Sequence, residues 1–330
     1  MIITRTPYRI SFFGGGSDFP EHYLKFGGRV IAAAINKYCY ISLRKLPPFF
    51  AHRDRIVWSE VENVSTLEQI HHPAVRAVLQ YYRLPYGVSM THDGDIPARS
   101  GIGSSSAFTV GLINAVETIL GNAPTSRELA DRAILIERER IGEIVGCQDQ
   151  ISSAFGGFNV IEFRRGGGYE VRPLAMNAER REEFQKHFLL VYSGVSRISS
   201  EVAREQFDRI SLNRDSLTEL AAMAAEAEKI LVSEQDISEF GKMLDECWKI
   251  KRSLSGRIST PLIDEIYECA RKAGALGGKV LGAGAGGFLF FFVPPGRRQR
   301  VTEALGRLMN IPVAVDEIGS TVIYNDHGES

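Results

Sequence analysis

A glycine- and serine-rich stretch in the first third of the chain has the residue types that bind phosphate. Its glycines let the backbone approach an anion closely, and its serine hydroxyls can bond phosphate oxygens or a metal ion. Apolar residues at helical spacing follow it, and Gly121 offers a stop, so the stretch precedes a buried helix. The unpaired N–H groups and positive dipole end of such a helix attract anions. The stretch reads Ile96-Pro97-Ala98-Arg99-Ser100-Gly101-Ile102-Gly103-Ser104-Ser105-Ser106-Ala107.

The same stretch has a simpler interpretation. A Gly/Ser segment can be an ordinary loop in which a serine caps the following helix. It is not a Walker P-loop, because no lysine follows the second glycine and the G-x-x-x-x-G-K-[ST] spacing is missing.

A second candidate for ligand chemistry lies near the N-terminus, where a strand-like run ends in the turn Gly14-Gly15-Gly16-Ser17-Asp18. Glycine costs backbone entropy on folding, so a packed chain keeps glycines where it turns tightly or a ligand comes close. Arg9 and Asp18 flank this turn. An aspartate can accept hydrogen bonds from sugar hydroxyls, and an arginine can neutralise phosphate charge. The alternative is a plain turn with both side chains in solvent.

A third candidate is Glu137, which lies beside the apolar face of a predicted helix and could point inward. Gly146 then breaks the helix, and the polar triplet Gln148-Asp149-Gln150 opens the next element. The alternative is a solvated, salt-bridged surface, which we expect for Glu139 and Glu143.

A glycine-rich stretch near the C-terminus, Gly277 to Gly287, contains a G-x-G-x-x-G pattern that begins at Gly282. We reject a dinucleotide-binding fold for it. The apolar run Phe288 to Val293 follows as a buried strand, whereas the dinucleotide fingerprint requires a helix there. We expect this loop to lie between a helix and that strand.

Composition narrows the class of protein. The 330 residues suggest one large or two ordinary domains, and the net charge of −1 favours neither nucleic acid nor a membrane surface as a partner. Four scattered cysteines without a C-x-x-C pair predict reduced thiols. No signal-peptide pattern is present at the N-terminus, and no apolar run could span a bilayer, so we expect a soluble, cytoplasmic protein. Homo-oligomerisation is left open.

The pattern of predicted secondary structure changes near residue 185, and we predict two domains, at 1–185 and 186–330. Strands alternate with helices before this point, whereas amphipathic helices dominate from Ser200 to Gly274. The predicted strands include Arg53–Trp58, Gly87–His92, Phe158–Phe163, His187–Ser193, Pro312–Val315 and Thr321–Tyr324, and the predicted helices include Leu217–Val232, Ile237–Leu254, Pro261–Gly274 and Arg297–Met309.

Three blocks of the sequence resemble the GHMP kinase family, which includes galactokinase, homoserine kinase and mevalonate kinase. The block P-x-R-[IV]-x-x-x-G-x-x-[ST]-D is filled from Pro7 to Asp18, and P-x-x-x-G-[LI]-G-S-S-x-A from Pro97 to Ala107. The block K-x-x-G-A-G-x-G-G is filled from Lys279 to Gly287. The spacing E-x(4)-G-x(3)-G-x-x-D-Q of galactokinase recurs from Glu137 to Gln150. The resemblance therefore spans nearly the whole chain.

The resemblance implies an α+β fold of two domains. The N-terminal domain would be like ribosomal protein S5 domain 2, and the C-terminal domain would be ferredoxin-like. The third block would pack against the nucleotide loop. ATP and Mg²⁺ are the implied cofactors, and a small sugar phosphate is the implied partner.

The resemblance also implies roles for individual residues. Asp149 would accept or orient the proton of the acceptor hydroxyl, aided by Arg9, and Ser105 with Glu137 would hold Mg²⁺. The nucleotide-binding residues would be Pro97, Arg99, Gly101, Ile102, Gly103, Ser104, Ser105 and Ser106, and the acceptor-binding residues Asp18, Gly15, Gly16, Ser17, Gln150 and Gly284.

The G-G-G-S-D form of the first block is similar to that of family members that phosphorylate heptose 7-phosphate or L-fucose. It implies phosphorylation of the C1 hydroxyl of D-glycero-α-D-manno-heptose 7-phosphate to the 1,7-bisphosphate, for nucleotide-activated heptose synthesis. The alternatives are another sugar 1-kinase (L-fucokinase-like or galactokinase-like), a GHMP-fold decarboxylase, and a non-catalytic ligand sensor. A remote phosphate needs a cation, for which the candidates are Arg29, Lys37, Arg53 and Arg99.

Overall fold

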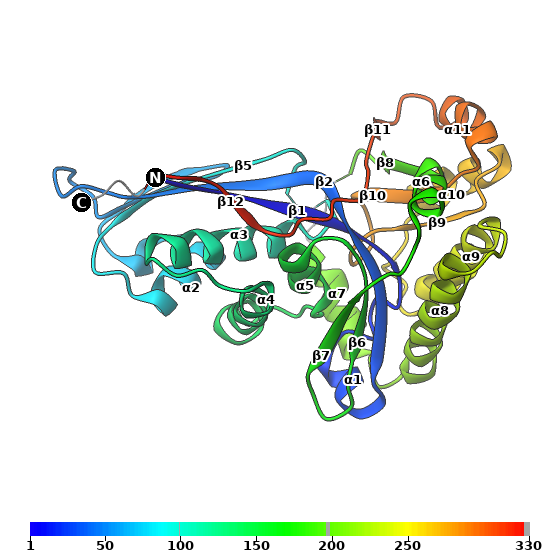
Figure 1. Cartoon of the computed structure of the whole chain (residues 1–330), viewed down its shortest axis with the longest axis horizontal. Coiled ribbons are helices and arrows are strands. Elements are labelled where there is room, and N and C mark those ends of the chain that lie inside the picture. Colours follow the sequence, from blue (N-terminus) through cyan, green and yellow to red (C-terminus); the bar gives the residue numbers. More distant parts are fainter. Residues whose placement is uncertain (99, 196–198, 327–330) are drawn as a thin grey trace.

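Two long antiparallel strands near the N-terminus support the larger of two sheets (Figure 1). The computed structural model describes residues 1–98, 100–195 and 199–326. β2 pairs with β1 along most of its length, with β6 near its start and with β5 near its end. The sheet order is β12-β1-β2-β5-β3-β4, and β7 extends it beyond β6. Its strands are β1 Ile2–Phe13, β2 Gly28–Lys45, β3 Asp54–Val57, β4 Val61–Val64, β5 Val88–Gly94, β6 Phe158–Phe163, β7 Tyr169–Pro173 and β12 Thr321–Asn325.

Helices cover one face of this sheet, and α3 lies against its central strands (Figure 1). All but a few residues of α3 are buried, because apolar side chains occupy nearly every direction around the helix. The helices of this half are α1 Pro20–Phe26, α2 Pro73–Tyr82, α3 Ser104–Ile119, α4 Ser126–Leu135, α5 Gln148–Phe155 and α6 Ala178–Lys186, with short turns at Leu67–Gln69 and Ile136–Ile141.

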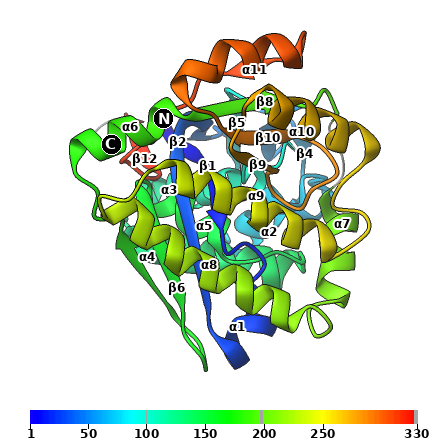
Figure 2. The ribbon, with the colours of Figure 1, turned by 90° about the vertical axis from the view of Figure 1, so that its right-hand side faces the viewer.

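The second sheet has four strands in the order β11-β8-β10-β9. Their order along the chain, with helices between the first and second and between the third and fourth, is the ferredoxin-like arrangement expected. α8 and α9 lie side by side (Figure 2). The elements are β8 Phe188–Tyr192, β9 Gly277–Val280, β10 Phe288–Phe292 and β11 Asn310–Ile311, with α7 Ser199–Asp208, α8 Arg214–Val232, α9 Ser238–Ser253, α10 Pro261–Ala273, the turn Pro295–Arg297 and α11 Arg298–Leu305.

Two sequence-based expectations are wrong in detail. The third glycine block follows a strand, β9, and not a helix, because its two glycines allow close packing: a Cβ at Gly277 would lie 2.0 Å from the Gly241 carbonyl oxygen. The strand expected at Pro312–Val315 is reduced to an isolated pairing of Val315 with Ile35. The ladder strand lies earlier, at β11, and proline has no N–H for a ladder.

The division at residue 185 stays a prediction. The second sheet begins just after it, at β8, but the last strand of the chain, β12, pairs with β1 of the first sheet. No helix in the described parts of the chain has the length and apolar character needed to cross a bilayer.

A cluster of phenylalanines joins the two sheets. Phe12, at the end of β1, is fully buried, and its ring centroid lies 5.2 Å from that of Phe290 on β10 and 5.4 Å from that of Phe158 on β6. Rings of α6, β8 and α9 complete the cluster at centroid distances of 5.7 and 5.8 Å from Phe12. The two halves therefore share one aromatic core at the strand that leads into the Gly14–Asp18 turn.

We predict that Phe12→Ala lowers the free energy of unfolding by about 3–5 kcal/mol, because it leaves a cavity where both sheets meet. The measurement is urea unfolding followed by circular dichroism. Phe49→Ala is the control, since Phe49 is 89% exposed, and a change within about 0.5 kcal/mol is expected for it. A loss below about 1 kcal/mol for Phe12→Ala would contradict a shared core.

Candidate active site

An ion pair between Arg9 of β1 and Asp149 of α5 lies at the centre of the candidate site. Arg9 Nε donates to Asp149 Oδ1 at 2.7 Å, and Arg9 Nη2 donates to Asp149 Oδ2 at 2.6 Å. The Arg9 side chain is only 3% exposed, whereas that of Asp149 is 26% exposed. Two parallel bonds fix the plane of the carboxylate. Asp149 is thus held rigidly while part of it still faces solvent.

The Gly/Ser loop folds over Arg9. The Arg9 backbone N–H donates to the Ile102 carbonyl oxygen at 3.0 Å, and Arg9 Nη1 donates to the Gly101 carbonyl oxygen at 2.8 Å. Gly103 has φ of 74°, a left-handed conformation that turns the chain into α3, the buried helix expected after this stretch, which begins at Ser104. The start of α3 and the Arg9–Asp149 pair are therefore adjacent.

Asp18 is buried under the triple-glycine turn and bonded to the backbone on both sides. Its Oδ1 accepts the Gly16 N–H at 2.9 Å, and its Oδ2 accepts the Gln148 N–H at 3.1 Å. Burial raises the pKa of Asp18, and these two N–H donors oppose that rise. Only glycine fits at position 146, where a Cβ would lie 1.9 Å from Asp18 Oδ2.

Glu137 is buried in a single wide π-type turn, Ile136–Ile141, that continues α4. Its Oε2 accepts hydrogen bonds from the Ser106 hydroxyl, at 2.9 Å, and from the Gln150 side-chain amide. Its Oε1 has no hydrogen-bond partner among the described residues. Burial raises the pKa of Glu137 to about 7, although these hydrogen bonds oppose the shift.

The first turn of α5 connects the acidic residues. Gln148 donates its backbone N–H to Asp18, Asp149 pairs with Arg9, and Gln150 bonds to Glu137. Successive residues of a helix point about 100° apart, so this one turn can reach three elements that are distant in sequence. The structure therefore brings Asp18, Glu137 and Asp149 around a single turn.

The third glycine block packs against the nucleotide loop, as expected. The Phe288 N–H donates to the Ser100 carbonyl oxygen at 3.0 Å. Gly284 lies against Ile258, whose carbonyl oxygen accepts the Ala285 N–H at 2.8 Å. The C-terminal half of the chain thus supports the loop that precedes α3.

Several predicted site residues have contacts that their sequence patterns do not indicate. The Ser17 hydroxyl donates to the Gly14 carbonyl oxygen at 2.7 Å, so it shapes the turn. Gln150, expected near the acceptor, bonds to Glu137. Pro97 is exposed at the entry of the loop, Gly15 lies near the Gln148 amide, and Arg99 lies outside the described residues.

The family resemblance implies that Ser105 and Glu137 hold Mg²⁺ together. In the structure, however, the hydroxyl that contacts Glu137 is that of Ser106. Ser105 is exposed in the same turn. Two buried lysines, Lys251 and Lys279, also reach backbone carbonyls near the site. Lys279 stands in the third block, whereas the charged run around Lys251 is typical of an exposed helix face and gives no signal.

The acidic residues fit a magnesium ion better than a protein-built metal cage. In the described parts of the chain, no group of three or more His, Cys, Asp or Glu is arranged to hold a metal. Mg²⁺ is commonly bound by one or two carboxylates together with phosphates and water. Glu137 Oε1, which is buried and has no hydrogen-bond partner among the described residues, could serve as such a ligand beside the start of α3.

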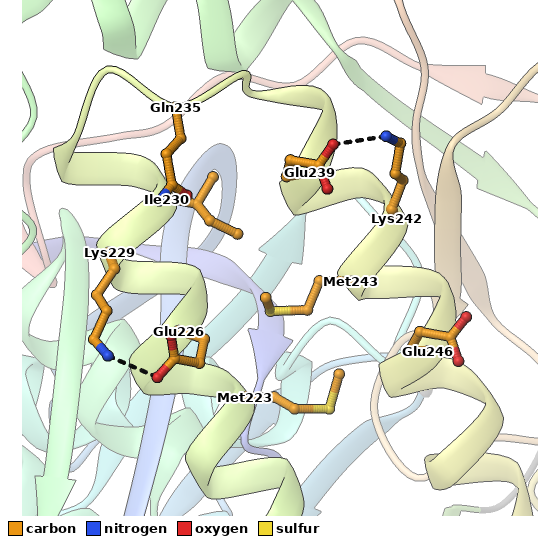
Figure 3. Close-up of a pocket in the computed structure, with 9 residues that line it drawn as sticks. All are labelled: Met223, Glu226, Lys229, Ile230, Gln235, Glu239, Lys242, Met243 and Glu246. Atoms are coloured by element: carbon orange, nitrogen blue, oxygen red, sulfur yellow. Dashed lines mark hydrogen bonds and ion pairs between the residues drawn. The ribbon is translucent and has the colours of Figure 1, made fainter.

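Two surface hollows elsewhere on the molecule do not overlap with these residues. One, of about 470 Å³, lies between α8 and α9, where the ion pairs Glu226–Lys229 and Glu239–Lys242 flank Met223 (Figure 3). The other, of about 550 Å³, lies between α9 and α10. Neither contains a residue of the three blocks.

The start of α3, whose free N–H groups can bind anions, lies beside the rigid Arg9–Asp149 pair and the buried acidic oxygens. These are the groups that phosphoryl transfer requires. Residues 69–157 match the GHMP kinases N terminal domain, and residues 223–311 match the GHMP kinases C terminal domain. The chain belongs to the GHMP kinase family and is a phosphotransferase.

The relatives include kinases of sugars. The chain is 30% identical over 315 residues to D-glycero-alpha-D-manno-heptose 7-phosphate kinase of Campylobacter jejuni, covering 92% of this chain and 93% of that protein. It is 25% identical to L-fucokinase/L-fucose-1-P guanylyltransferase of Bacteroides fragilis, covering 87% of this chain and 34% of that protein. The crystal structure of a D-glycero-D-manno-heptose 1-phosphate kinase from Bacteroides thetaiotaomicron superposes with a TM-score of 0.80 at 26% identity, covering 98% and 100% of the two chains.

We predict that Glu137→Gln changes how stability depends on pH in the metal-free protein. The folded protein holds this proton up to a pKa of about 7, whereas the unfolded chain releases it near 4.5. Wild-type stability is therefore unaffected by Glu137 below pH 4.5 and falls as the pH rises through 7, by about 3 kcal/mol in all. Glu137→Gln lacks this loss, so its stability relative to wild type rises across that range.

The measurement is thermal and urea unfolding between pH 4 and 8 in the presence of a chelator. Glu139→Gln is the matched control, because Glu139 is exposed two residues away. Equal pH slopes for wild type and Glu137→Gln would contradict the environment assigned to Glu137.

Proposed function

We propose that this chain is an ATP-dependent sugar-phosphate kinase that phosphorylates the C1 hydroxyl of D-glycero-α-D-manno-heptose 7-phosphate. The observation that carries the proposal is the convergence of Arg9, Asp149 and Asp18 beside the anion-binding start of α3. The heptose-kinase relatives, alike over nearly their whole length, support the choice of acceptor. Cytoplasm, where ATP is available, is the compartment that such a reaction requires.

The triphosphate of ATP would lie across the loop from Gly101 to Ser106. The first N–H groups of α3 have no partner within the helix and bear the positive end of its dipole, so they can hold phosphate oxygens. The close packing of Arg9 under this loop adds a fixed positive charge. The chain therefore binds the nucleotide with backbone donors and one buried cation.

Asp149 would orient the acceptor hydroxyl and receive its proton. Its two bonds to Arg9 hold the carboxylate in one orientation, which a positioned proton acceptor requires. As the γ-phosphoryl group moves to the hydroxyl oxygen, negative charge spreads over its oxygens, and Arg9 stabilises that charge. Mg²⁺ bound at Glu137 and a serine hydroxyl would neutralise phosphate charge and fix its geometry.

The sugar would lie at the turn from Gly14 to Asp18, with its hydroxyls near Asp18. α8 covers this turn, because a Cβ at Gly16 would lie 2.8 Å from Leu217 Cδ2. The buried carboxylate of Asp18 is already held by two N–H groups, which gives it one fixed orientation. A rigid acceptor of hydrogen bonds suits a polyhydroxylated ligand.

A cationic side chain would bind the remote phosphate of the sugar, and the contacts of the candidate residues differ. Arg29 bonds to Glu162 at 2.6 Å, and Arg53 donates to the carbonyl oxygens of Leu84 and Tyr86. Both guanidiniums are thus engaged within the protein. Lys37 has no ion pair among the described residues, which leaves its ammonium available.

A second candidate function is phosphorylation of another sugar at C1. The fucokinase relative covers 87% of this chain, and the chemistry proposed for Asp149 and Arg9 would be unchanged. A decarboxylase and a non-catalytic sensor receive less support, because the residues proposed for transfer are all present and Asp149 lies in a bidentate pair with Arg9.

We predict that Asp149→Asn lowers kcat by about 10²–10⁴-fold, because an amide cannot accept the hydroxyl proton. ATP should still bind within a few-fold of wild type, since Asp149 makes no part of the loop that holds the triphosphate. The measurements are ADP release in a coupled assay and calorimetric binding of a non-hydrolysable ATP analogue.

Asp215→Asn is the control for Asp149→Asn, because Asp215 is exposed and forms its ion pair with its neighbour Arg214. An equal loss of nucleotide affinity and of turnover in Asp149→Asn would contradict the role given to Asp149.

We also predict a preference among acceptors. With ATP and Mg²⁺, kcat/KM for heptose 7-phosphate should exceed that for L-fucose or D-galactose by about 100-fold or more, because a cationic contact to the remote phosphate is lost with the simple sugars. The measurement is initial rates over a panel of sugars and sugar phosphates, with phosphorus NMR to locate the new phosphate. A best rate with L-fucose would select the second candidate function.

A further inference from the structure

We propose that Lys251 of α9 is a positioning residue for the nucleotide, because it fixes the third glycine block against the loop that cradles the triphosphate. The inference rests on the proposed ATP site and adds to it a residue outside all three sequence blocks. α9 packs along β9, the strand that leads into the third block (Figure 2).

The ammonium group of Lys251 is held by two carbonyls of the third block. Lys251 is 9% exposed, and its Nζ donates to the Gly282 carbonyl oxygen at 2.7 Å and to the Val280 carbonyl oxygen at 3.1 Å. These bonds connect α9 to Val280 at the end of β9 and to Gly282, the first glycine of the loop that follows. The lysine therefore determines where the loop leaves the sheet.

Burying the Lys251 ammonium group lowers the stability of the folded protein when no ligand is bound. Its Nζ lies within ion-pairing distance of no carboxylate in the described part of the chain, and an ammonium without a counter-charge is poorly solvated by protein. Burial lowers the pKa of Lys251, the nearby cations Lys279 and Arg9 lower it further, and Asp149 raises it. An arriving polyphosphate would supply the missing negative charge.

The loop held by Lys251 touches the nucleotide loop backbone to backbone. A Cβ at Gly101 would lie 2.7 Å from the Leu281 carbonyl oxygen, and a Cβ at Gly282 would lie 2.8 Å from Gly101 Cα. Both glycines have positive φ, 85° and 64°, so no other residue fits this contact without strain. Any shift of Gly282 is therefore transmitted to Gly101.

Gly101 is in turn hydrogen-bonded to Arg9 of the Arg9–Asp149 pair. Its carbonyl oxygen accepts the bond from Arg9 Nη1 at 2.8 Å, and Arg9 holds Asp149. A continuous set of contacts thus joins the Lys251 ammonium to the loop under the triphosphate. The acceptor turn at Asp18 is held by other groups, the N–H groups of Gly16 and Gln148. Loss of Lys251 should therefore affect ATP more than the sugar.

The test is the Lys251→Met variant, which keeps the length of the side chain but removes its charge and donors. Wild type must first bind the magnesium complex of a non-hydrolysable ATP analogue, and its failure to do so would refute the proposed function itself. For Lys251→Met we expect the dissociation constant of the analogue and the KM for ATP to rise about tenfold or more. The KM for the sugar acceptor should stay within about twofold.

Lys242→Met is the matched control, because Lys242 lies on the same helix, is exposed and forms its ion pair with Glu239 (Figure 3). It should bind both ligands as wild type does. A folded Lys251→Met protein with unchanged affinity for the analogue would overturn the proposal. An equal weakening of both ligands would also overturn it, since that is the result of a purely structural role.

A measurement on the wild type keeps the inference testable if Lys251→Met does not fold. Hydrogen exchange of the amides from Leu281 to Ala285 should slow at least several-fold when the ATP analogue binds, together with those from Gly101 to Ser104. Protection of the nucleotide loop without protection of the third block would overturn the proposal.

Discussion

The bidentate pair of Arg9 and Asp149 is the interaction on which the geometry of the site depends. It connects a strand at the start of the chain to a helix 140 residues later. A nearly buried guanidinium is costly unless its donors are satisfied, and here two go to Asp149 and a third to the Gly101 carbonyl oxygen. The same cation therefore orders the Asp149 carboxylate and the loop from Gly101 to Ser106, so neither can move independently.

The three carboxylates of the candidate site have different environments, and the differences match the different tasks that we propose for them. Asp149 is partly exposed and bonded to a cation, Asp18 is buried and bonded to backbone N–H groups, and Glu137 is buried with one oxygen unpaired. A proton acceptor needs a fixed carboxylate that the substrate can reach, a sugar contact needs a fixed hydrogen-bond acceptor, and a metal ligand needs a free oxygen. Placement within the fold, and not residue type, separates the three proposed roles.

Residue patterns indicated the local parts of this arrangement, and only the family resemblance indicated which distant segments meet. The glycines and serines followed by apolar periodicity predicted a buried helix after this stretch, because that signal depends on neighbouring residues. The family resemblance implied Ser105 as the partner of Glu137, whereas the contact is made by Ser106, since one residue rotates the hydroxyl by about 100° around the helix. The sequence also offered no reason to select Lys251. Its burial depends on β9, and the two glycines of β9 weaken the strand signal in the sequence.

The Gly14–Asp18 turn, where we propose that the acceptor binds, is supported by both halves of the chain through the core that the two sheets share. Phe12 lies two residues before Gly14 in β1 and packs on rings from both sheets. Its carbonyl oxygen accepts a bond from the buried Lys279 ammonium of β9 at 2.9 Å. The strand that carries Arg9 is thus bonded at its end to the same sheet that supports the nucleotide loop. Both substrates of a transfer reaction must be held within a fraction of an ångström of each other, and a shared core provides that rigidity.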